Sequence, residues 1–325
     1  MLNQKLINLL KKNKRYISKS KIICIGDIIL DHYITGKVER TSPEAPVPIF
    51  IMKKQKYEIG GVGNVAKNIS SIGAKPTLLC LSGNDHSSMI IKKLLDDDTN
   101  IKDINIRIPN FKTPKKTRFI KDKKHLFRID DENTGFKLIN KYKKIILKKL
   151  DNEIKKNDLI ILSDYNKGLF DKNLIKKIIK LSIKYNKKII ADPKKIDLSI
   201  YGYIDILTPN QKEMTDAAKK KLLNEKNLIK FGKSIIQKNK IKNLLITRSE
   251  KGMLLINNDL IKKFKSNPKK VIDVTGAGDT VIAVLGLMLA LNFSVDESIE
   301  VSNYAAGKAI GISGTASLRF ADLIK

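Results

Sequence analysis

Residues 273–280 read DVTGAGDT and place a glycine turn beside a carboxylate at the start of an apolar run. That run, residues 281–291, predicts a buried helix. Gly276, Ala277 and Gly278 would then lie at its N-terminus, where backbone N–H groups are unpaired and the helix dipole adds partial positive charge. Because glycine lets a ligand approach the backbone closely, the turn predicts an anion-binding site.

Asp279 follows this turn directly. An anion-binding helix start beside a carboxylate suits phosphoryl transfer to a hydroxyl group. The backbone would stabilise the developing phosphate charge, and the carboxylate would accept the proton as a general base. The simpler alternative is an aspartate that caps the helix after a glycine turn. The motif alone leaves both interpretations open.

Short apolar runs alternate with lysine-rich helical patterns along most of the chain, which predicts a doubly wound, mostly parallel α/β sheet flanked by helices. The predicted strands are residues 21–26, 77–82, 158–163, 187–192, 205–210 and 243–249. Ligands of such sheets bind beyond the carboxyl ends of the strands. The polar residues at these ends are Asp27, Asp164, Asp192, Asn210 and Thr247.

Two segments break the alternation, at about residues 33–61 and 105–130. Both show strand-like periodicity without intervening helices, and we expect a small inserted β-sheet that covers the mouth of the main sheet as a lid. Pro43, Pro46 and Pro48 fit extended or edge positions in it. Residues 1–325 would otherwise form one domain.

Two further motifs carry polar groups suited to a polyol. Asp27 and Asp31, in GDIILDHY, could accept hydrogen bonds from sugar hydroxyls, although either could equally cap a turn. Gly60 and Gly61 open the helix of GGVGNVAKN, where Asn64 can both donate and accept. Many helices begin in this way, so the second motif is weak evidence when taken alone.

Three strand ends add groups for phosphate and metal: SDYNKG at residues 163–168, ADPK at 191–194 and TPNQKE at 208–213. Asn210 and Glu213 could reach a hydrated Mg²⁺ through water. They could also form a capping box, and the two interpretations are compatible. TRSEKG, residues 247–252, predicts a strand and tight turn that could lie against a nucleotide.

Composition limits the classes that remain. Cys24 and Cys80 lie in apolar runs and are expected to be buried thiols in a reducing compartment. No apolar stretch approaches the roughly 20 residues of a membrane span, and no leader pattern opens the sequence, so we expect a cytoplasmic protein with no membrane partner. His32, His86 and His125 show no metal-ligand spacing.

The net charge is +31, from 64 Lys and Arg against 33 Asp and Glu. Such a balance could indicate a nucleic-acid-binding protein. The lysines are spread along the whole length without an aromatic-interleaved basic stripe, and there is no Trp. We therefore interpret the charge as compositional and expect no nucleic-acid partner, although it would attract phosphorylated substrates.

The order of these motifs resembles the ribokinase-like (PfkB) carbohydrate kinases from about residue 21 to 317, because both family signatures, GGVGNVA and DVTGAGDT, are present. Within that family the chain is most similar to the D-glycero-β-D-manno-heptose 7-phosphate kinases, the kinase half of the bifunctional heptose enzymes of lipopolysaccharide synthesis. TSPEAPVP, residues 41–48, is the most discriminating motif because sugar kinases differ most in their lids.

The resemblance implies ATP-dependent phosphorylation of the anomeric hydroxyl of the heptose 7-phosphate, with Mg²⁺ and with Asp279 as base. It implies a sugar site at Asp31, Gly60, Gly61 and Asn64, and phosphate contacts at Lys167 and Lys194. Asn210 and Glu213 would organise Mg²⁺ through water. The nucleotide site would comprise Thr247, Arg248, Gly252, Asp273, Asn303 and Gly307.

The phosphate of a heptose 7-phosphate needs a cationic partner. Candidates in the lid segments are Arg40, Arg118, Lys123, His125 and Arg128, and each could instead be a solvated surface charge. Ribokinase, fructokinase and phosphofructokinase-like activities remain alternatives within the family. A nucleic-acid-binding protein is the remote alternative outside it.

Departures from the subgroup also matter. The segment GISGTASLRF, residues 311–320, is less polar than usual, which puts residues beyond Thr315 in doubt as site residues. No HxGH nucleotidyltransferase signature occurs, so we expect a stand-alone kinase whose partner transferase is a separate protein. Free lid edges favour a homodimer. The sequence leaves open whether a monovalent cation assists.

Overall fold

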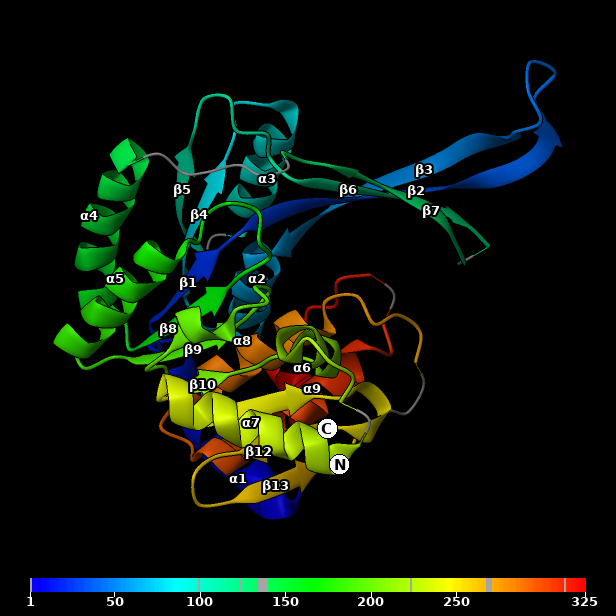
Figure 1. Cartoon of the computed structure of the whole chain (residues 1–325). Helices are drawn as coiled ribbons and strands as arrows, with labels where there is room; N and C mark the ends of the chain where they lie inside the picture. The colour runs from blue at the N-terminus through cyan, green and yellow to red at the C-terminus, as the bar shows by residue number, and fades with distance from the viewer. Residues whose placement is uncertain are drawn as a thin grey trace.

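The computed structural model describes residues 2–98, 100–122, 124–133, 140–222, 224–266, 271–312 and 314–325. A large sheet lies between two layers of helices, and a β-arm projects from one end of this body (Figure 1). The arm carries the lid strands and the body carries the strand ends named above, so the architecture is the α/β fold with a lid that the sequence predicts.

The large sheet has the strand order β13-β12-β11-β10-β9-β8-β1-β4-β5 in the described part of the chain. Its pairs are parallel except for β11–β12 and β12–β13, which are antiparallel. The strands are β1 Ile22–Gly26, β4 Thr77–Ser82, β5 Lys102–Arg107, β8 Leu159–Ser163, β9 Lys188–Asp192, β10 Ile206–Leu207, β11 Asn243–Thr247, β12 Met253–Ile256 and β13 Ile261–Phe264.

All six predicted strands are present, but β10 is shorter than the predicted run because Pro209 cannot donate to the ladder. Beyond it, Asn210 forms only an isolated bridge to Thr247. Three strands were not predicted: β5, β12 and β13. Strand β5 pairs with β4 in the large sheet, so the second lid segment begins at Lys115 and not near residue 105.

Two layers of helices bury the faces of this sheet in separate apolar clusters. The helices are α1 Gln4–Ile17, α2 Val62–Ile72, α3 His86–Asp96, α4 Asn140–Lys156, α5 Lys172–Lys184, α6 Gln211–Ala218, α7 Glu225–Asn239, α8 Ala277–Ala290, α9 Val295–Ala309 and α10 Phe320–Leu323. Helix α8 is buried along nearly its whole length, as a helix apolar on all sides must be. Gly286 lets it pack against Ile161 of β8.

The lid is a four-stranded sheet of order β3-β2-β6-β7, formed by β2 Ile28–Thr41, β3 Pro48–Gly61, β6 Lys115–Lys121 and β7 Lys124–Asp131. Strand β2 is buried where it leaves the body and exposed toward its end. Gly36 is required there, since a Cβ would lie 2.5 Å from the Phe50 ring that crosses β2 to meet Phe119.

Strand β1 lies between β8 and β4, so the chain runs outward on both sides of it. The carboxyl ends of β1 and β8 therefore form a topological switch point, where ligands of such folds bind. Only Asp27 separates β1 from the lid strand β2, which places the root of the lid at the switch point. Cys24 and Cys80 are free and buried, as predicted. Among the described residues, no helix has the length and apolar character of a membrane span.

Candidate active site

Asp279 lies in the first turn of α8 and is buried, with 4% of its surface exposed. Asn64 Nδ2 donates to Oδ2 over 2.8 Å, and the Tyr165 hydroxyl donates to Oδ1 over 2.7 Å. Burial raises the pKa of Asp279 to about 6, against the opposing effect of these two donors. The carboxylate is therefore largely ionised at neutral pH and basic enough to accept a proton from a hydroxyl.

The glycine turn before Asp279 has the conformation that the motif predicts. Gly276 has a φ of 75°, in the left-handed region, and a Cβ there would lie 2.8 Å from Asn64 Nδ2. A Cβ on Gly278 would meet nothing within 4 Å, so the space beside the helix start is open. Ala277 N donates to Val274 O over 3.2 Å, a long bond that an anion would have to replace.

Asn64 is itself oriented by its neighbours in α2 and α8. Asn68 Nδ2 donates to Asn64 Oδ1 over 3.2 Å, which leaves the Asn64 amide nitrogen facing Asp279. Thr280 in turn donates to Asn68 Oδ1 over 3.4 Å. The glycine motif of α2 thus meets DVTGAGDT directly, although more than 200 residues separate the two in sequence.

Asp27 shapes the loop that carries Tyr165. Its carboxylate accepts backbone N–H bonds from Tyr165 and Lys167, both over 3.0 Å, and from Leu169 over 3.2 Å. Burial raises the pKa of Asp27 to about 6, and the three N–H donors oppose that rise. Both oxygens are thus occupied by the protein backbone, so Asp27 contributes to the site through the loop it organises.

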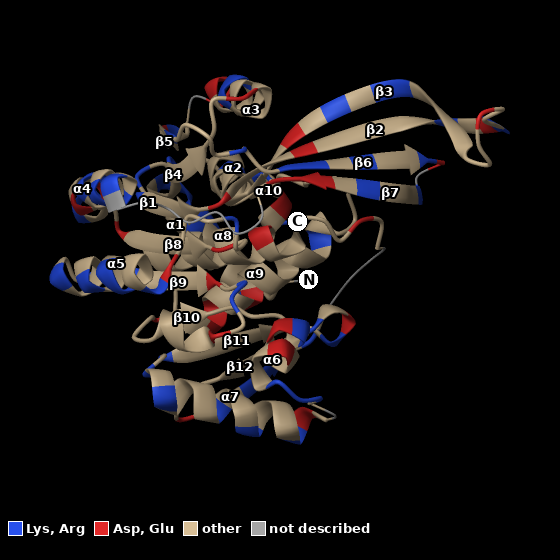
Figure 2. Cartoon of the chain, turned by 45° about the horizontal axis from the view of Figure 1, so that its top comes forward, with Lys and Arg blue, Asp and Glu red and all other residues tan. Residues whose placement is uncertain are grey.

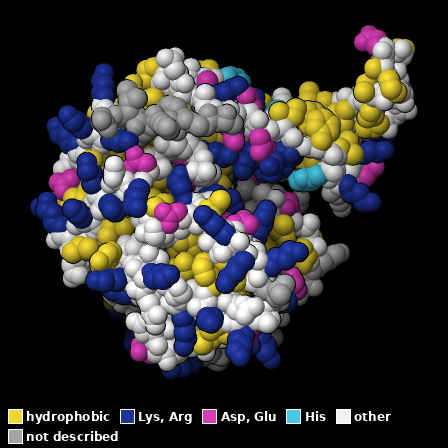
Figure 3. All heavy atoms as spheres, in the orientation of Figure 1, with side chains coloured by type: hydrophobic (Ala, Val, Ile, Leu, Met, Phe, Trp, Pro, Cys, Tyr) yellow, Lys and Arg dark blue, Asp and Glu magenta, His cyan; other side chains and the backbone are white. Residues whose placement is uncertain are grey.

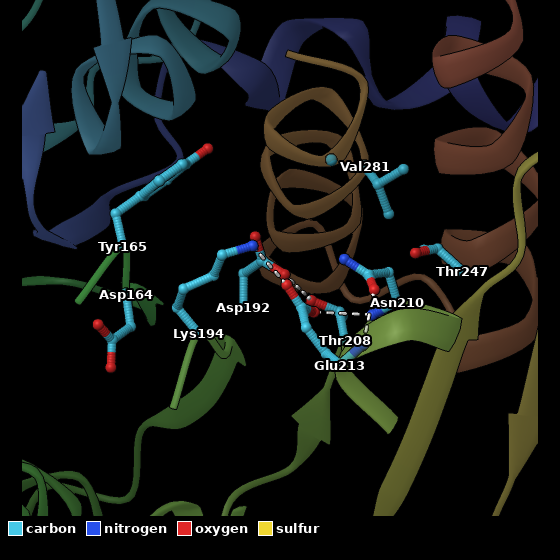
Figure 4. A pocket seen from close by; sticks show the side chains of 10 residues that line it. Asp164, Tyr165, Asp192, Lys194, Thr208, Asn210, Glu213, Thr247 and Val281 are labelled. Atoms are coloured by element: carbon cyan, nitrogen blue, oxygen red, sulfur yellow. Dashed lines mark hydrogen bonds and ion pairs between the residues drawn. The ribbon is translucent and has the colours of Figure 1, made fainter. Parts of the chain in front are cut away.

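A cavity of about 160 Å³ opens beside this loop and the start of α8. Its lining comes from the carboxyl ends of β8 to β11 and from α8: Asp164, Tyr165, Asp192, Lys194, Thr208, Asn210, Glu213, Thr247, Gly278 and Val281 (Figure 4). Burial, and then the carboxylates of Glu213 and Asp279, raise the pKa of Asp192 well above its usual range. The sequence predicted that this strand end would lie at the ligand-binding edge of the sheet, but it did not indicate a role for Asp192.

Asn210 and Glu213 form the predicted capping box at the start of α6, with bonds of 2.9 Å in each direction. Lys194 reaches across the cavity to Glu213 Oε1 over 2.8 Å (Figure 4). No set of three or more metal-binding side chains converges within the described chain. Asp192 and Glu213 nevertheless both line this space, which fits a hydrated cation held through its waters better than one held directly.

The residues that we expect to bind the sugar lie where the lid joins the body. Arg118 Nη1 of β6 contacts Asp31 Oδ1 of β2 over 2.6 Å, and both side chains are buried. A Cβ on Gly60 would lie 2.1 Å from Asp31 Oδ2, so only glycine leaves room for that carboxylate. The backbone of Gly61 has a φ of 60° and turns the chain from β3 into α2. Asn64 follows in the first turn of α2 and donates to Asp279.

Most of the candidate phosphate cations in the described residues already have acidic partners. Lys167 Nζ lies 2.5 Å from Glu132 Oε1, and Arg128 Nε lies 2.6 Å from Asp130 Oδ1. Arg40 and His125 are exposed on the arm. Lys123 lies outside the described residues.

Lys116 is a further cation near the site, and the sequence motifs did not indicate it. It is partly buried, 5.6 Å from the Tyr165 ring centroid, and no carboxylate of the described chain is within ion-pair distance. Burial lowers its pKa, the nearby carboxylates of Asp31 and Asp130 oppose this, and the charges of Lys167 and Arg128 lower it further. The signal in the sequence was a lysine pair before Arg118 at the start of a lid strand.

Among the expected nucleotide residues that the structure describes, only Thr247 borders this cavity, and Arg248 and Asn303 line other hollows. Arg248 N bonds Gly252 O over 2.9 Å and Arg248 Nη1 pairs with Glu225 over 2.6 Å. Asn303 of α9 donates to Lys265 O over 2.8 Å. Gly307 is partly exposed four residues further along α9.

The C-terminal loop connects the glycine turn to the lid. Asp273 accepts from Thr275 N and Gly314 N, both over 2.9 Å. Glu58 of β3 is buried and accepts from Thr315 N over 2.9 Å and from the Thr315 hydroxyl. Thr315 thus packs against the lid root.

Solved structures with a similar fold include two kinases. Phosphofructokinase-2 from Escherichia coli, in complex with potassium, superposes with a TM-score of 0.77 at 18% identity, covering 94% of this chain and 96% of that one. Ribokinase of Arabidopsis thaliana, complexed with ribose and ATP, gives 0.71 at 16% identity, covering 94% and 97%. These likenesses confirm the ribokinase-like fold.

The pfkB family carbohydrate kinase profile matches residues 19–320, and the chain belongs to that family. It is therefore a sugar kinase. Similar curated proteins include the bifunctional protein HldE of Campylobacter fetus subsp. fetus, 35% identical over 93% of this chain, and that of Sulfurimonas denitrificans, 36% identical over 93%. The chain spans less than two thirds of their lengths, 65% and 63%.

Proposed function

We propose that the chain transfers the γ-phosphoryl group of ATP to the anomeric hydroxyl of D-glycero-β-D-manno-heptose 7-phosphate, giving the 1,7-bisphosphate. The observation that carries this proposal is the buried Asp279 carboxylate at the open start of α8, beside a cavity lined by Lys194 and Glu213. The relatives named HldE support the choice of a heptose, and TSPEAPVP, which runs from the end of β2 to the start of β3, resembles the heptose kinase subgroup.

In the proposed reaction the sugar O–H bond breaks as its proton passes to Asp279. The sugar oxygen forms a bond to the γ-phosphorus, and the bond from that phosphorus to the bridging oxygen of ADP breaks. The glycine turn and the helix dipole stabilise charge on the transferring group. Lys194 lies on the cavity wall where it can bind phosphate once it leaves Glu213.

Magnesium fits the cavity through the oxygens of Asp192, at the end of β9, and of Asn210 and Glu213, at the start of α6. When bound, it would neutralise charge on the nucleotide phosphates. The protein's own part is to hold those oxygens in place. The capping box of α6 fixes Asn210 and Glu213 against each other, and Thr208 donates to Asp192 Oδ1 over 3.2 Å.

Lys116 supports recognition of a phosphorylated sugar. Its ammonium is partly buried between the lid root and Tyr165, and Arg118 beside it is neutralised by Asp31. A dianionic phosphate entering at this point would gain a cation that has no carboxylate partner among the described residues. We therefore place the substrate phosphate near Lys116, with Lys167 and Arg128 joining it if their acidic partners move.

A substrate screen tests the proposal. Purified protein with ATP and Mg²⁺ is given heptose 7-phosphate, fructose 6-phosphate, ribose and fructose, and ADP release and sugar products are measured. We expect fastest turnover with the heptose 7-phosphate. Faster turnover of an unphosphorylated sugar, with none of the heptose 7-phosphate, would contradict the proposal in favour of a ribokinase or fructokinase. Fast use of fructose 6-phosphate alone would favour a phosphofructokinase-like enzyme.

The lid supports pairing with a second copy of the chain. Phe119 stacks on Phe127 with ring centroids 4.4 Å apart and meets Phe50 at 5.3 Å, so these rings cover one face of the sheet. Phe127 is 51% exposed and Ile129, two residues on, is 49% exposed. The projecting arm carries much apolar surface (Figure 3). A second lid would cover the same face symmetrically in a homodimer.

Light scattering after size exclusion tests this pairing. We expect a dimer that becomes monomeric in Ile129→Glu, which leaves the stacked rings intact. Ile183→Glu, at an exposed position of α5 away from the lid, is the control and keeps the dimer. A monomeric wild-type protein would exclude lid pairing.

We place this reaction in the cytoplasm, as a step in the synthesis of ADP-heptose for lipopolysaccharide. A nucleotidyltransferase would act later on the product. The positive charge is spread over helices and lid alike (Figure 2), which favours a compositional origin over a nucleic-acid site. Tight, steeply salt-dependent binding of DNA or RNA would support the remote alternative instead.

A further inference from the structure

We propose that Tyr165 is a positioning residue for Asp279: its hydroxyl holds the carboxylate in the orientation, and in the ionised state, in which it can take a proton from the substrate. The inference rests on the proposed role of Asp279 as base. Tyr165 lies in the loop after β8, within SDYNKG, and the spacing of the motif gave it no role.

The two hydrogen bonds to Asp279 fix the plane of its carboxylate. Tyr165 occupies Oδ1 and Asn64 occupies Oδ2, at 2.7 and 2.8 Å. Each carboxylate oxygen can accept more than one hydrogen bond, so each keeps a free site for a substrate hydroxyl. One donor alone would leave the carboxylate free to rotate about its χ2 bond.

The loop holds Tyr165 at both its backbone and its ring. Its backbone N–H donates to Asp27 Oδ2 over 3.0 Å, and the neighbouring N–H groups of Lys167 and Leu169 bond the same carboxylate. Its ring is partly buried, with the Lys116 ammonium 5.6 Å from its centroid. The hydroxyl cannot swing away from Asp279 unless this set of contacts breaks.

Several charged groups face Asp279 and act on its titration. Asp31 of β2 disfavours the carboxylate and Lys116 of β6 favours it. Asp192, at the end of β9, is a further carboxylate nearby. Tyr165 and Asn64 favour the ionised form by donating to it, against burial, which is the largest influence. Removing the Tyr165 hydroxyl therefore raises the pKa of Asp279.

A titration of Asp279 tests the inference without any sugar. The full chain is labelled with ¹³C at aspartate carboxyl carbons, and the Asp279 signal is assigned by its loss in Asp279→Asn. In Tyr165→Phe we expect its midpoint to move up by about one pH unit. Tyr201→Phe is the matched control, because Tyr201 is a buried phenol that likewise donates to a carboxylate, Asp164 Oδ2, over 2.5 Å.

The control should leave the Asp279 midpoint unchanged. An unshifted midpoint in Tyr165→Phe, or an equal shift in Tyr201→Phe, would overturn the inference. Turnover of heptose 7-phosphate provides the second readout: the acid limb of kcat should move up with the midpoint, so the deficit is about fivefold greater at pH 6 than at pH 8.5. If the chain phosphorylates a different sugar, the titration still tests Tyr165 on its own.

Discussion

The floor of the site and its lid are built in opposite ways. The floor, formed by the ends of β8 to β11 and the starts of α6 and α8, holds buried and partly buried carboxylates whose positions are fixed by a capping box and by side-chain hydrogen bonds. The lid is a single layer of strands that leaves large apolar side chains such as Phe127 exposed. Asp279 belongs to the first region and Lys116 to the root of the second.

This difference assigns separate tasks to the two regions. Burial perturbs the acids of the floor strongly, and perturbed acids suit proton transfer. The root of the lid contributes an ammonium without an acidic partner in the described chain, which suits recognition of an anionic substrate. Changes in the floor should therefore alter kcat, and changes at the lid root should alter KM and the choice of sugar.

The largest effect is expected for Asp279→Asn. The variant loses the proton acceptor while keeping a side chain of the same size, so kcat should fall by about 10²–10⁴-fold with little change in KM. Steady-state kinetics with saturating ATP measure it. Asp151→Asn, on the surface of α4, removes an equal charge and should retain full activity. Near-normal turnover in Asp279→Asn would end its assignment as base.

Lys116→Met tests the lid root. We expect kcat/KM for the phosphorylated sugar to fall by about 10–100-fold, mainly through KM, because the ammonium should bind ground state and transition state alike. The matched control is Lys124→Met, at an exposed position of β7. Equal losses of kcat/KM in the two variants would mean that only the net charge matters. The assignment of substrate recognition to the lid root would then be wrong.

The burial of Asp279 should also affect how the free energy of unfolding depends on pH. Its pKa is raised in the folded state to about 6, from 3.8, so the ionised form destabilises the fold above pH 6 and the penalty is relieved as pH falls toward 4. Relative to Asp279→Asn, the wild type should gain about 1–3 kcal/mol between pH 7.5 and 4.5. Urea unfolding of both proteins across this range measures the difference in their free energies of unfolding. If the Asp279 carboxylate were solvated, this difference would not change with pH.

The smallest effect is expected where lid and body meet. Thr315→Val removes the hydroxyl donated to Glu58 but keeps the backbone N–H bond, so the free energy of unfolding should fall by about 1–2 kcal/mol. Thermal and urea unfolding measure it, with kcat expected within a factor of about two. A large loss of kcat would show that the floor and the lid do not have separate tasks.

The sequence was sufficient for the parts of the fold that repeat a simple pattern. Apolar runs predicted the central strands, and the uninterrupted apolar stretch predicted α8. It did not reveal β5, β12 or β13, because the charged edge strand β5 and the short hairpin lack a strong periodicity of their own. The boundary of the second lid segment was misplaced for the same reason.

The site was predicted in its motifs but not in its contacts. DVTGAGDT named Asp279, yet nothing local to it indicates Asn64 or Tyr165, which come from other elements. Lys116 and Arg118 are two residues apart, and only the fold shows that one has an acidic partner and the other does not. Pairing of this kind is set by tertiary structure and leaves no trace in spacing.

Asp27 should make activity fall more steeply as the pH is lowered. Its ionised carboxylate accepts the three N–H groups that hold the Tyr165 loop, and its pKa of about 6 matches that of Asp279. Acidification would protonate the base and the anchor of its positioning loop over one range. Loss of activity would then follow the uptake of two protons, with a limiting slope near two in a plot of log rate against pH. The enzyme would switch off over a narrower span of acidity than any single carboxylate could produce.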